Sequence, residues 1–561
     1  MPLQLRLSSS CPAGDPAPQT QTLEMPMTTI HNPILPGFNP DPAFCRAGDD
    51  YYIATSTFEW YPGVQIHHSR DLVNWRLICR PLDRQSQLDM RGNPDSCGVW
   101  APALTYADGL FWLIYTDVKR RLGNFKDTHN YLVTAPSIDG LWSDPIYMNS
   151  SGFDPSLFHD EDRRKWFVNM VWDHRRRRSS FDGILLQEYS PAERRLIGPV
   201  KNIFKGSPLG LVEGPHLWKR NGWYYLTVAE GGTSYDHAVT MARSRNIDGP
   251  YELHPDTHLL TSRDAPDAPL QRAGHGFYVE TSTGEIFHTH LCSRPLPGTR
   301  RSPLGRETAI QRVVWGDDDW LYLAHGGQIP AVEVEGPDLP PHPFPAESER
   351  HDFDDGTLPS VFQWLRTPDR ERLFSLRTRA GYLRLYGRES IGSWFEQALV
   401  ARRQTEWSYS AETMVEFKPE TYQQLAGLIC YYDRARFHYL AVSSDDEGRR
   451  VLQVISCLGD YPDSLMSYML DSDLPLPPDG PIHLGVDVHL ADLQFRWSVD
   501  GVSWNPVGPV LDASILSDEA GPGGHGSFTG AFVGMAAHDL TGRALPADFD
   551  YFVYRAAGRG E

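Results

Sequence analysis

The chain has 561 residues, more than one hydrophobic core usually serves, so two or more domains are expected. Its formal net charge of −20 argues against nucleic acid or an anionic membrane as partner, because both require a basic patch. Aromatic residues make up 12 % of the chain, which suits β-structure and flat surfaces that stack on sugars. A neutral ligand is the simplest expectation.

The seven cysteines are scattered without CxxC spacing, so the sequence indicates neither a disulfide framework nor a zinc site. The first 28 residues lack the apolar core of a signal peptide, and no later stretch is apolar enough to span a bilayer. We therefore expect a soluble, cytoplasmic protein. Residues 1–30 are expected to form a disordered leader.

Between residues 31 and 325 the chain repeats itself about every sixty residues. Each repeat has a short cluster rich in Pro, Gly or polar residues, followed by an aromatic strand such as "DDYYIATST" or "NGWYYLTVAE". The clusters are "NPDP" (39–42), "WAPA" (100–103), "FDPS" (153–156), "EGPH" (213–216) and "GHG" (274–276). Short strands separated by turn residues at this period are typical of propeller blades, whereas helical repeats would show 3.6-residue periodicity.

Five repeats predict a five-bladed β-propeller as the catalytic domain, residues 31–325. Equivalent positions of the blades face a shared central channel in that architecture. One residue of each cluster, here called a marker residue, is therefore expected to meet the others in space. The marker residues are Asp41, Trp100, Asp154, Glu213 and His275.

The composition changes after the propeller region. Residues 326–348 are rich in Pro and acidic residues, as a semi-rigid linker would be. Residues 349–561 alternate in strand fashion, as in "IHLGVDVHL" (482–490), and Asp500-Gly501 predicts a hairpin turn. The sequence thus predicts an all-β protein whose propeller is followed by a C-terminal β-sandwich.

Three carboxylates among the marker residues indicate acid/base chemistry. Like charges held together in a partly dry pocket move their pKa values apart, so one group can carry a proton while another stays ionised. Two such groups on either side of an acetal are the minimum equipment of glycoside hydrolysis. A hydrolytic zinc site fits less well, because it needs three suitable ligands and only His275 among the markers is a soft donor.

The motifs closely resemble glycoside hydrolase family 43, specifically its two-domain β-xylosidases. The likeness runs from residue 31 nearly to the C-terminus and includes "GFNPDPAFCRAGDDYYIATSTFEWYPG", "GVWAPALTYADGLFWLIYTDVK", "GFDPSLFHD", "EGPHLW", "SPLGRETAIQ", "GSFTGAFVGM" and "LPADFDYFVY". The resemblance implies a five-bladed propeller with a lectin-like, concanavalin A-like sandwich. It also implies an inverting, exo-acting β-D-xylosidase that releases xylose from the non-reducing ends of short β-1,4-xylo-oligosaccharides.

The resemblance assigns roles to the three acids. Asp41, in "NPDP", matches the family's general base, and Glu213, in "EGPH", matches its general acid. Asp154, in "GFD", matches the residue that tunes the pKa of the acid and orients it. The structural alternatives for these acids are a loop cap or a turn.

Five further residues are candidates by the same resemblance. Arg306, in "PLGRET", matches a substrate-binding arginine, with a surface ion pair as the alternative. Trp100 and Phe58 match walls of the sugar pocket, and Phe528 matches a sandwich residue over its mouth; core packing is the alternative for all three. His275 matches a histidine that, in some family members, helps hold calcium or another divalent ion through water, and a satisfied buried histidine is the alternative.

Two other functions remain open at this point. The pocket suits an α-L-arabinofuranosidase or a dual enzyme, since arabinofuranose and xylopyranose place similar hydroxyls. A carbohydrate-binding propeller without catalysis is the non-enzymatic alternative, although neutral sugars do not need three convergent carboxylates. Xylo-oligosaccharides are the expected partners, no cofactor is expected to be required, and a homo-oligomer, dimer or tetramer, is expected from the resemblance.

Overall fold

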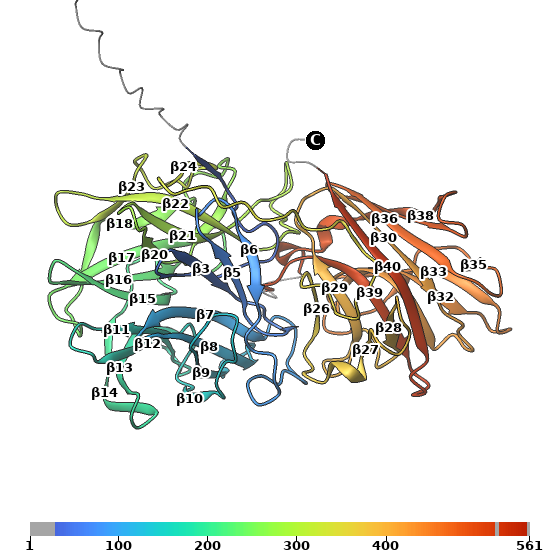
Figure 1. The fold of residues 1–561 in the computed structure, drawn as a ribbon, viewed down its shortest axis with the longest axis horizontal. Helices are drawn as coiled ribbons and strands as arrows, with labels where there is room; N and C mark the ends of the chain where they lie inside the picture. The colour runs from blue at the N-terminus through green and yellow to red at the C-terminus, as the bar shows by residue number, and fades with distance from the viewer. Residues whose placement is uncertain (1–27, 522–526, 558–561) are drawn as a thin grey trace, which may run out of the picture.

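The computed structural model describes residues 28–521 and 527–557. These residues form strands and three short 3-10 helices, η1 (Arg370–Arg372), η2 (Ala513–Ile515) and η3 (Asp518–Ala520), with no α-helix among them. The predicted all-β class is therefore confirmed. No helix in the described ranges is long and apolar enough to cross a membrane. Two bodies lie side by side, the N-terminal one in blue to yellow and the C-terminal one in yellow to red (Figure 1).

The N-terminal body is a five-bladed β-propeller, as predicted. Each blade is an antiparallel sheet built from strands that follow one another in the chain. The blades are β2 (Ala43–Ala47), β3 (Asp50–Thr55), β5 (Gln65–Ser69) and β6 (Arg76–Cys79); β7 (Gly98–Ala107), β8 (Leu110–Arg120), β9 (Asp127–Ala135) and β10 (Ile146–Asn149); β11 (Ser156–His159), β12 (Lys165–Trp172), β13 (Phe181–Ser190) and β14 (Arg195–Phe204); β15 (Glu213–Arg220), β16 (Trp223–Glu230), β17 (Ala238–Ser244) and β18 (Glu252–Thr261); and β19 (Gln271–Gly274), β20 (Tyr278–Glu280), β21 (Ile286–Ser293), β22 (Glu307–Trp315) and β23 (Leu321–Leu323).

The first strand of each blade lies next to the first strand of a neighbour, as β2 does with β7, β7 with β11 and β11 with β15. These strands therefore surround the channel. The aromatic strands recognised in the sequence come second in the blades and are mostly buried: β8 is buried over eight consecutive positions and β16 over its last six. Apolar and aromatic side chains on both faces of the strands pack adjacent blades together, which explains the aromatic repeat.

One backbone feature recurs at the channel end of every blade. A residue with a positive φ lies just before the first strand, within its first four residues, or directly after it; it is Asp41 (57°), Ala101 (33°), Asp154 (54°), Gly214 (57°) or His275 (44°). Four of the five are followed by a proline and the last by Gly276. A left-handed conformation is unfavourable for residues other than glycine, so its repetition identifies the structurally equivalent positions. Trp100 and Glu213 stand one residue before the equivalent position of their blades.

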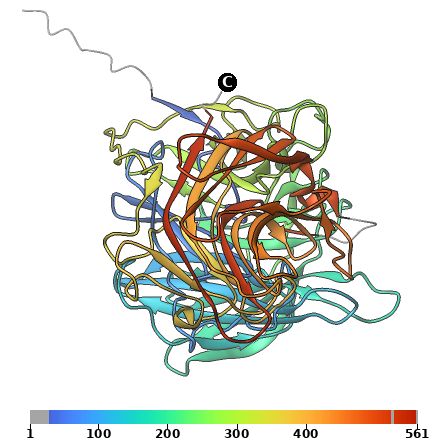
Figure 2. The same cartoon turned by 90° about the vertical axis from the view of Figure 1, so that its right-hand side faces the viewer.

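The C-terminal body is a β-sandwich of two antiparallel sheets, as predicted (Figure 2). One sheet contains β27 (Phe374–Ser375), β28 (Leu383–Tyr386), β40 (Pro546–Ala556), β30 (Tyr409–Glu416), β36 (Ile482–His489), β37 (Asp492–Ser498) and β38 (Asn505–Asp512), with β25 (Arg350–His351) on β40. The other contains β34 (Ser467–Tyr468), β33 (Arg450–Leu458), β32 (Arg436–Ser444), β31 (Gln424–Asp433), β39 (Phe532–Asp539), β29 (Ala398–Arg403), β26 (Phe362–Leu365) and β4 (Trp60–Tyr61), with β35 (Leu474–Pro475) on β33.

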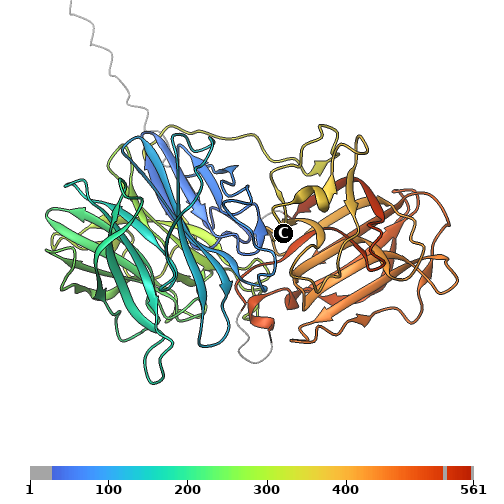
Figure 3. The same cartoon turned by 90° about the horizontal axis from the view of Figure 1, so that it is seen from below.

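The strand β4 belongs to the propeller in sequence and to the sandwich in hydrogen bonding. It pairs with β26, with Tyr61 opposite Trp364 and Trp60 opposite Leu365. The indole of Trp60 also stacks on the ring of Phe532, with the ring centroids 3.7 Å apart. The two bodies therefore share one sheet, and buried aromatic side chains from both lie at their contact. Figure 3 shows the two bodies side by side from below.

A second pairing joins the two ends of the propeller region. β1 (Thr29–His31) forms an antiparallel ribbon with β24 (Glu333–Glu335). β1 thus begins within the predicted leader, and β24 lies within the predicted linker. Both segments are too short to show a strand pattern of their own, and their order comes from pairing across the chain.

Candidate active site

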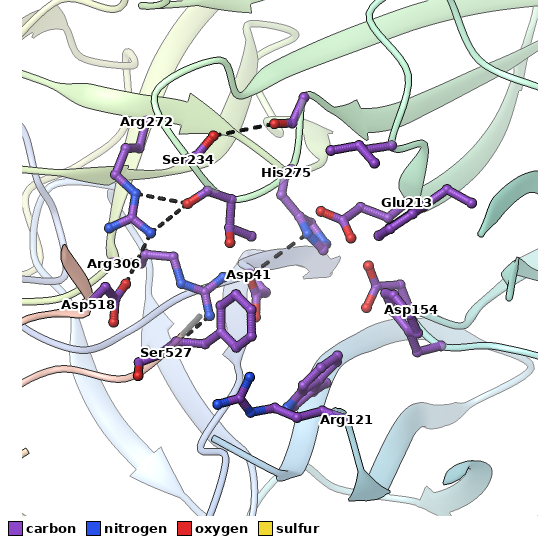
Figure 4. Close-up of a pocket in the computed structure, with 18 of the residues that line it drawn as sticks. Asp41, Arg121, Asp154, Glu213, Ser234, Arg272, His275, Arg306, Asp518 and Ser527 are labelled. Atoms are coloured by element: carbon purple, nitrogen blue, oxygen red, sulfur yellow. Dashed lines mark hydrogen bonds and ion pairs between the residues drawn. The ribbon is translucent and has the colours of Figure 1, made fainter. Parts of the chain in front are cut away.

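The five marker residues line one pocket of about 610 Å³. Phe58, Arg306 and Phe528 line the same pocket, so every site residue expected from the sequence is found there. Asp41 lies between Arg306 on one side and Glu213 and Asp154 on the other (Figure 4). Because Phe528 comes from the sandwich, both bodies contribute to the pocket.

Asp41 is buried and held by two strong hydrogen bonds. Arg306 donates from Nη1 to Oδ1 at 2.7 Å, and Ser56 donates from Oγ to Oδ2 at 2.6 Å. Burial alone would raise the pKa of Asp41, but the charges of Arg306 and His275 and the hydrogen bond from Ser56 bring it below the usual 3.8. Asp41 is therefore ionised at neutral pH, as a general base requires.

Glu213 differs from Asp41 in its protonation state. It begins β15, its side chain is buried, and Oε1 has no hydrogen-bond partner among the described residues. Burial and the negative charge of Asp41 raise the pKa of Glu213 from 4.5 to about 8, against the opposing charges of Arg306 and Lys126. Glu213 therefore carries a proton at neutral pH and can donate it, which a general acid must do.

Asp154 lies beside Glu213 and contacts the same segment of backbone. Its Oδ2 accepts a hydrogen bond from the backbone N–H of Gly214 at 3.1 Å, so it helps fix the residue that follows Glu213. Burial raises the pKa of Asp154 well above 3.8, and the charges of Glu213 and Asp41 raise it further. Because Asp154 and Glu213 interact as like charges, ionisation of either one favours the proton on the other.

Arg306 connects the general-base candidate to the sandwich. Its Nη1 holds Asp41, and its Nη2 donates to the backbone carbonyl of Phe528 at 3.0 Å. The side chain of Arg306 is only 2 % exposed, and its guanidinium is held by these two partners, with the ring of Phe58 5.3 Å away. The sandwich therefore orients the charge that keeps Asp41 ionised.

Ser96 links the walls of the pocket to one another. Its Oγ accepts a hydrogen bond from the backbone N–H of Phe528 at 3.1 Å, and its carbonyl accepts one from Nε1 of Trp100 at 3.0 Å. The rings of Phe528 and Trp100 meet edge to face with centroids 5.8 Å apart, and Phe58 lies 5.7 Å from Trp100. Three aromatic rings thus form a wall able to pack against the apolar face of a sugar.

His275 completes the centre of the pocket, with Nδ1 3.8 Å from Oδ1 of Asp41. Among the described residues, no three His, Cys, Asp or Glu side chains are arranged to hold a metal ion. Calcium takes six to eight oxygen ligands, and the side chains of the described residues offer no such cluster for direct coordination. A water-mediated ion at His275 stays a prediction.

Several lining residues were not anticipated from the sequence. Arg121 lies over the ring of Phe528 at 5.2 Å, and Arg272 forms ion pairs with Asp518 and Glu519 of the sandwich at 3.0 and 2.8 Å. The other unanticipated lining residues include Lys126, Trp172, Phe181 and Tyr235. None stands in a repeat cluster, and the ion pairs of Arg272 cross about 250 residues of sequence.

Both bodies of the protein match known protein families. Residues 30–321 match the model of glycosyl hydrolases family 43, and residues 350–555 match that of the beta xylosidase C-terminal concanavalin A-like domain. A Humicola insolens protein named xylosidase/arabinosidase 43B is 59 % identical over 531 residues, covering 94 % of this chain and 98 % of the relative. A beta-xylosidase of Bacillus subtilis (strain 168) is 50 % identical over 536 residues, covering 94 % and 99 %.

Solved structures give the same relationship. The crystal structure of a xylan beta-1,4-xylosidase from Bacillus halodurans C-125 superposes with a TM-score of 0.92 at 54 % identity, covering 94 % of this chain and all of that one. The agreement extends over both the propeller and the sandwich. This chain belongs to glycoside hydrolase family 43.

Proposed function

We propose that the protein is an inverting, exo-acting β-D-xylosidase that releases xylose from the non-reducing ends of short β-1,4-xylo-oligosaccharides. The observation that carries the proposal is the contrast between two buried carboxyls of one pocket: the charge of Arg306 keeps Asp41 ionised, whereas burial keeps Glu213 protonated. Relatives of about 50 % identity that are named beta-xylosidases support the choice of sugar.

The reaction follows from these protonation states. Asp41 takes a proton from water as that water attacks the anomeric carbon, and Glu213 gives its proton to the departing sugar oxygen. Asp154 holds the backbone after Glu213 and discourages ionisation of Glu213. Trp100, Phe58 and Phe528 pack against the terminal sugar. The sandwich closes one side of the pocket, which favours attack at chain ends.

A dual xylosidase and α-L-arabinofuranosidase is the second candidate. It is supported by the relative of 59 % identity, which is named for both activities. Initial rates on the 4-nitrophenyl β-D-xylopyranoside and α-L-arabinofuranoside, measured side by side, distinguish the two. Comparable kcat/KM values on both would favour the dual enzyme.

The experiment that tests the main proposal is proton NMR of xylobiose hydrolysis, recorded before the product mutarotates. An inverting β-xylosidase releases α-xylose first. Initial β-xylose would overturn the single-displacement mechanism, and an absence of sugar release would overturn the enzymatic proposal altogether. Because arabinofuranoside is tested in parallel, rapid arabinose release without xylose would favour the alternative.

The pH profile is expected to be broad, with its basic limb set by Glu213. The reactive form of Glu213 is protonated, and its pKa of about 8 means that this form disappears as the pH rises through 8. The reactive form of Asp41 is ionised and is lost only as the pH falls below 3.8. We expect kcat/KM to be constant between about pH 5 and 7 and to fall above about pH 8. A basic limb near pH 5 would contradict the assignment.

Phe528→Ala is expected to weaken substrate binding without unfolding the protein. The ring is partly exposed and contributes one face of the aromatic wall, and an aromatic contact of this kind is worth about 0.5–1.5 kcal/mol. The expected result is a loss of kcat/KM on xylobiose of about 3- to 10-fold, mostly in KM. Phe395→Ala, which removes an exposed ring outside the pocket, is the matched control and should change nothing. A wild-type KM in Phe528→Ala would place the ring outside the binding site.

The assembly and location stay predictions. A homodimer or homotetramer would be detected by light scattering coupled to size-exclusion chromatography. A cytoplasmic location would be detected by fractionating cells that express the chain.

A further inference from the structure

A second cavity, of about 580 Å³, lies between the first blade, residues 344–347 and the sandwich. Four arginines line it: Arg76 and Arg80 from the propeller, and Arg402 and Arg403 from the sandwich. Arg402 and Arg403 are each only 7 % exposed. We call this cavity the interdomain arginine pocket. Its concentration of positive charge is unexpected in a chain with a net charge of −20.

These arginines have no carboxylate partner among the residues that the structure describes. None forms an ion pair within 4.0 Å, although such pairs occur throughout the rest of the protein. Arg80 donates to the side-chain oxygen of Gln65 at 2.6 Å and to the carbonyl of Ser360 at 2.6 Å, both neutral acceptors. The exposed Glu347 also lines the cavity and attracts Arg80 and Arg402 from beyond 4.0 Å. It is the single acidic residue in a lining that holds four arginines, so positive charge remains in excess.

The two buried sandwich arginines also have unused donors. Nε of Arg402 and Nη2 of Arg403 have no hydrogen-bond partner in the described structure. Arg402 lies over the ring of Tyr554 at 4.2 Å, and Arg403 donates from Nε to the carbonyl of Phe38. The buried Arg306 and Arg366 likewise leave one donor nitrogen each without a partner, but these two arginines and Arg272 each pair with a carboxylate, which Arg402 and Arg403 do not.

A buried charge without a counter-charge is expensive, because water no longer solvates it and nothing replaces that solvation. Several guanidinium groups around one cavity increase the cost, since they repel one another. An oxyanion in the cavity would offset most of this cost of burying charge, because the planar fork of donors on arginine matches carboxylate and phosphate oxygens. Water would fill the space but would not neutralise the charge.

The interdomain arginine pocket adjoins the loop that carries Asp41, and Asn39 of that loop lines it. Gln65, which accepts from Arg80, donates in turn to Oδ1 of Asn39 at 2.7 Å, two residues before Asp41. Arg403 holds the carbonyl of Phe38 in the same loop. Whatever neutralises these arginines therefore also stabilises the backbone of the general-base loop.

We propose that the interdomain arginine pocket binds one small oxyanion, of the phosphate, sulfate or carboxylate class, which neutralises the four arginines of the lining and fixes the loop that carries Asp41. The anion is a structural ligand and not a substrate. The site is separate from the proposed xylosidase pocket and does not depend on that function.

Two measurements on the full chain test the proposal. The first is ion chromatography of anions released by denaturing protein that has been dialysed against chloride buffer, which detects an anion that stays bound. The second is isothermal titration calorimetry of the dialysed protein with sodium phosphate, sulfate or malonate at constant ionic strength. The three titrants distinguish a tetrahedral anion from a carboxylate.

We expect either one released anion per chain or saturable binding of one anion per chain. Arg402→Met removes the charge and retains much of the apolar stem, and Arg76→Met does the same at an exposed position where folding is not at risk. Each variant should weaken binding at least about tenfold, as expected for the loss of one charge-assisted hydrogen bond. Arg121→Met, at the active-site pocket, is the control and should bind the anion as the wild type does.

Three results would overturn the proposal. One is the absence of both a released anion and titratable binding in the wild type. Another is unchanged affinity in Arg76→Met and in a folded Arg402→Met. The third is a loss of binding in Arg121→Met alone, which would assign the anion to the active site.

Discussion

Glu213→Gln is expected to slow the hydrolysis of xylobiose by at least about 10²- to 10⁴-fold, the usual contribution of a positioned proton donor. Glutamine keeps the size of the side chain and removes the acidic proton. A xylose leaving group needs that proton, because its alkoxide is a poor leaving group. The loss should be much smaller on 4-nitrophenyl β-D-xylopyranoside, because nitrophenolate departs without protonation. Initial rates on the two substrates measure the difference.

The same variant tests the origin of the pH profile. Its residual activity on the nitrophenyl substrate should lack the basic limb near pH 8, since the group that titrates there has been removed. Glu447→Gln, a change at an exposed glutamate of the sandwich, is the control and should behave as the wild type. An equal loss on both substrates would argue that Glu213 is not the proton donor.

Asp41→Asn is expected to reduce activity as much as Glu213→Gln does, but on both substrates alike. Asparagine cannot accept a proton from water, so activity should fall by at least about 10²- to 10⁴-fold whatever the leaving group. The substitution also leaves Arg306 buried without its carboxylate, so the melting temperature should fall as well. Rates on xylobiose and on the nitrophenyl xyloside, with thermal unfolding in parallel, measure both effects.

Asp445→Asn is the matched control for that variant. Asp445 pairs with Arg449, which is exposed, so its loss should alter neither rate nor stability appreciably. If folded Asp41→Asn retained near wild-type activity on both substrates, Asp41 would not be the base. A loss on xylobiose alone would exchange the roles of the two acids.

The repeat made most of the propeller predictable. Asp41, Asp154 and His275 stand at equivalent backbone positions, so their spacing identified the blades directly. Glu213 and Trp100 stand one residue earlier, because Gly214 and Ala101 take the left-handed position in their blades. A spacing of about sixty residues changes little when a marker residue moves by one position. The sequence therefore predicted that the marker residues converge, but it did not show which of them take the left-handed conformation.

Contacts between distant segments were not predictable in the same way. Arg306 could be identified by its motif, but its second partner is a backbone carbonyl, that of Phe528, which has no sequence pattern. The pairing of Arg272 with Asp518 joins two residues whose local sequences show no relation. Such contacts depend on how two complete bodies pack, and periodicity within either body carries no information on that packing.

The strand β4 has a consequence for how the protein can be divided. A cut within residues 326–348 would separate the propeller from the sandwich in sequence, yet the sandwich would lose the edge partner of β26 and the propeller would expose Trp60. An uncovered edge strand and an uncovered aromatic ring both favour aggregation. The two bodies are thus expected to fold as one unit, and any other module in the place of the sandwich would have to pair with β4 and cover Trp60.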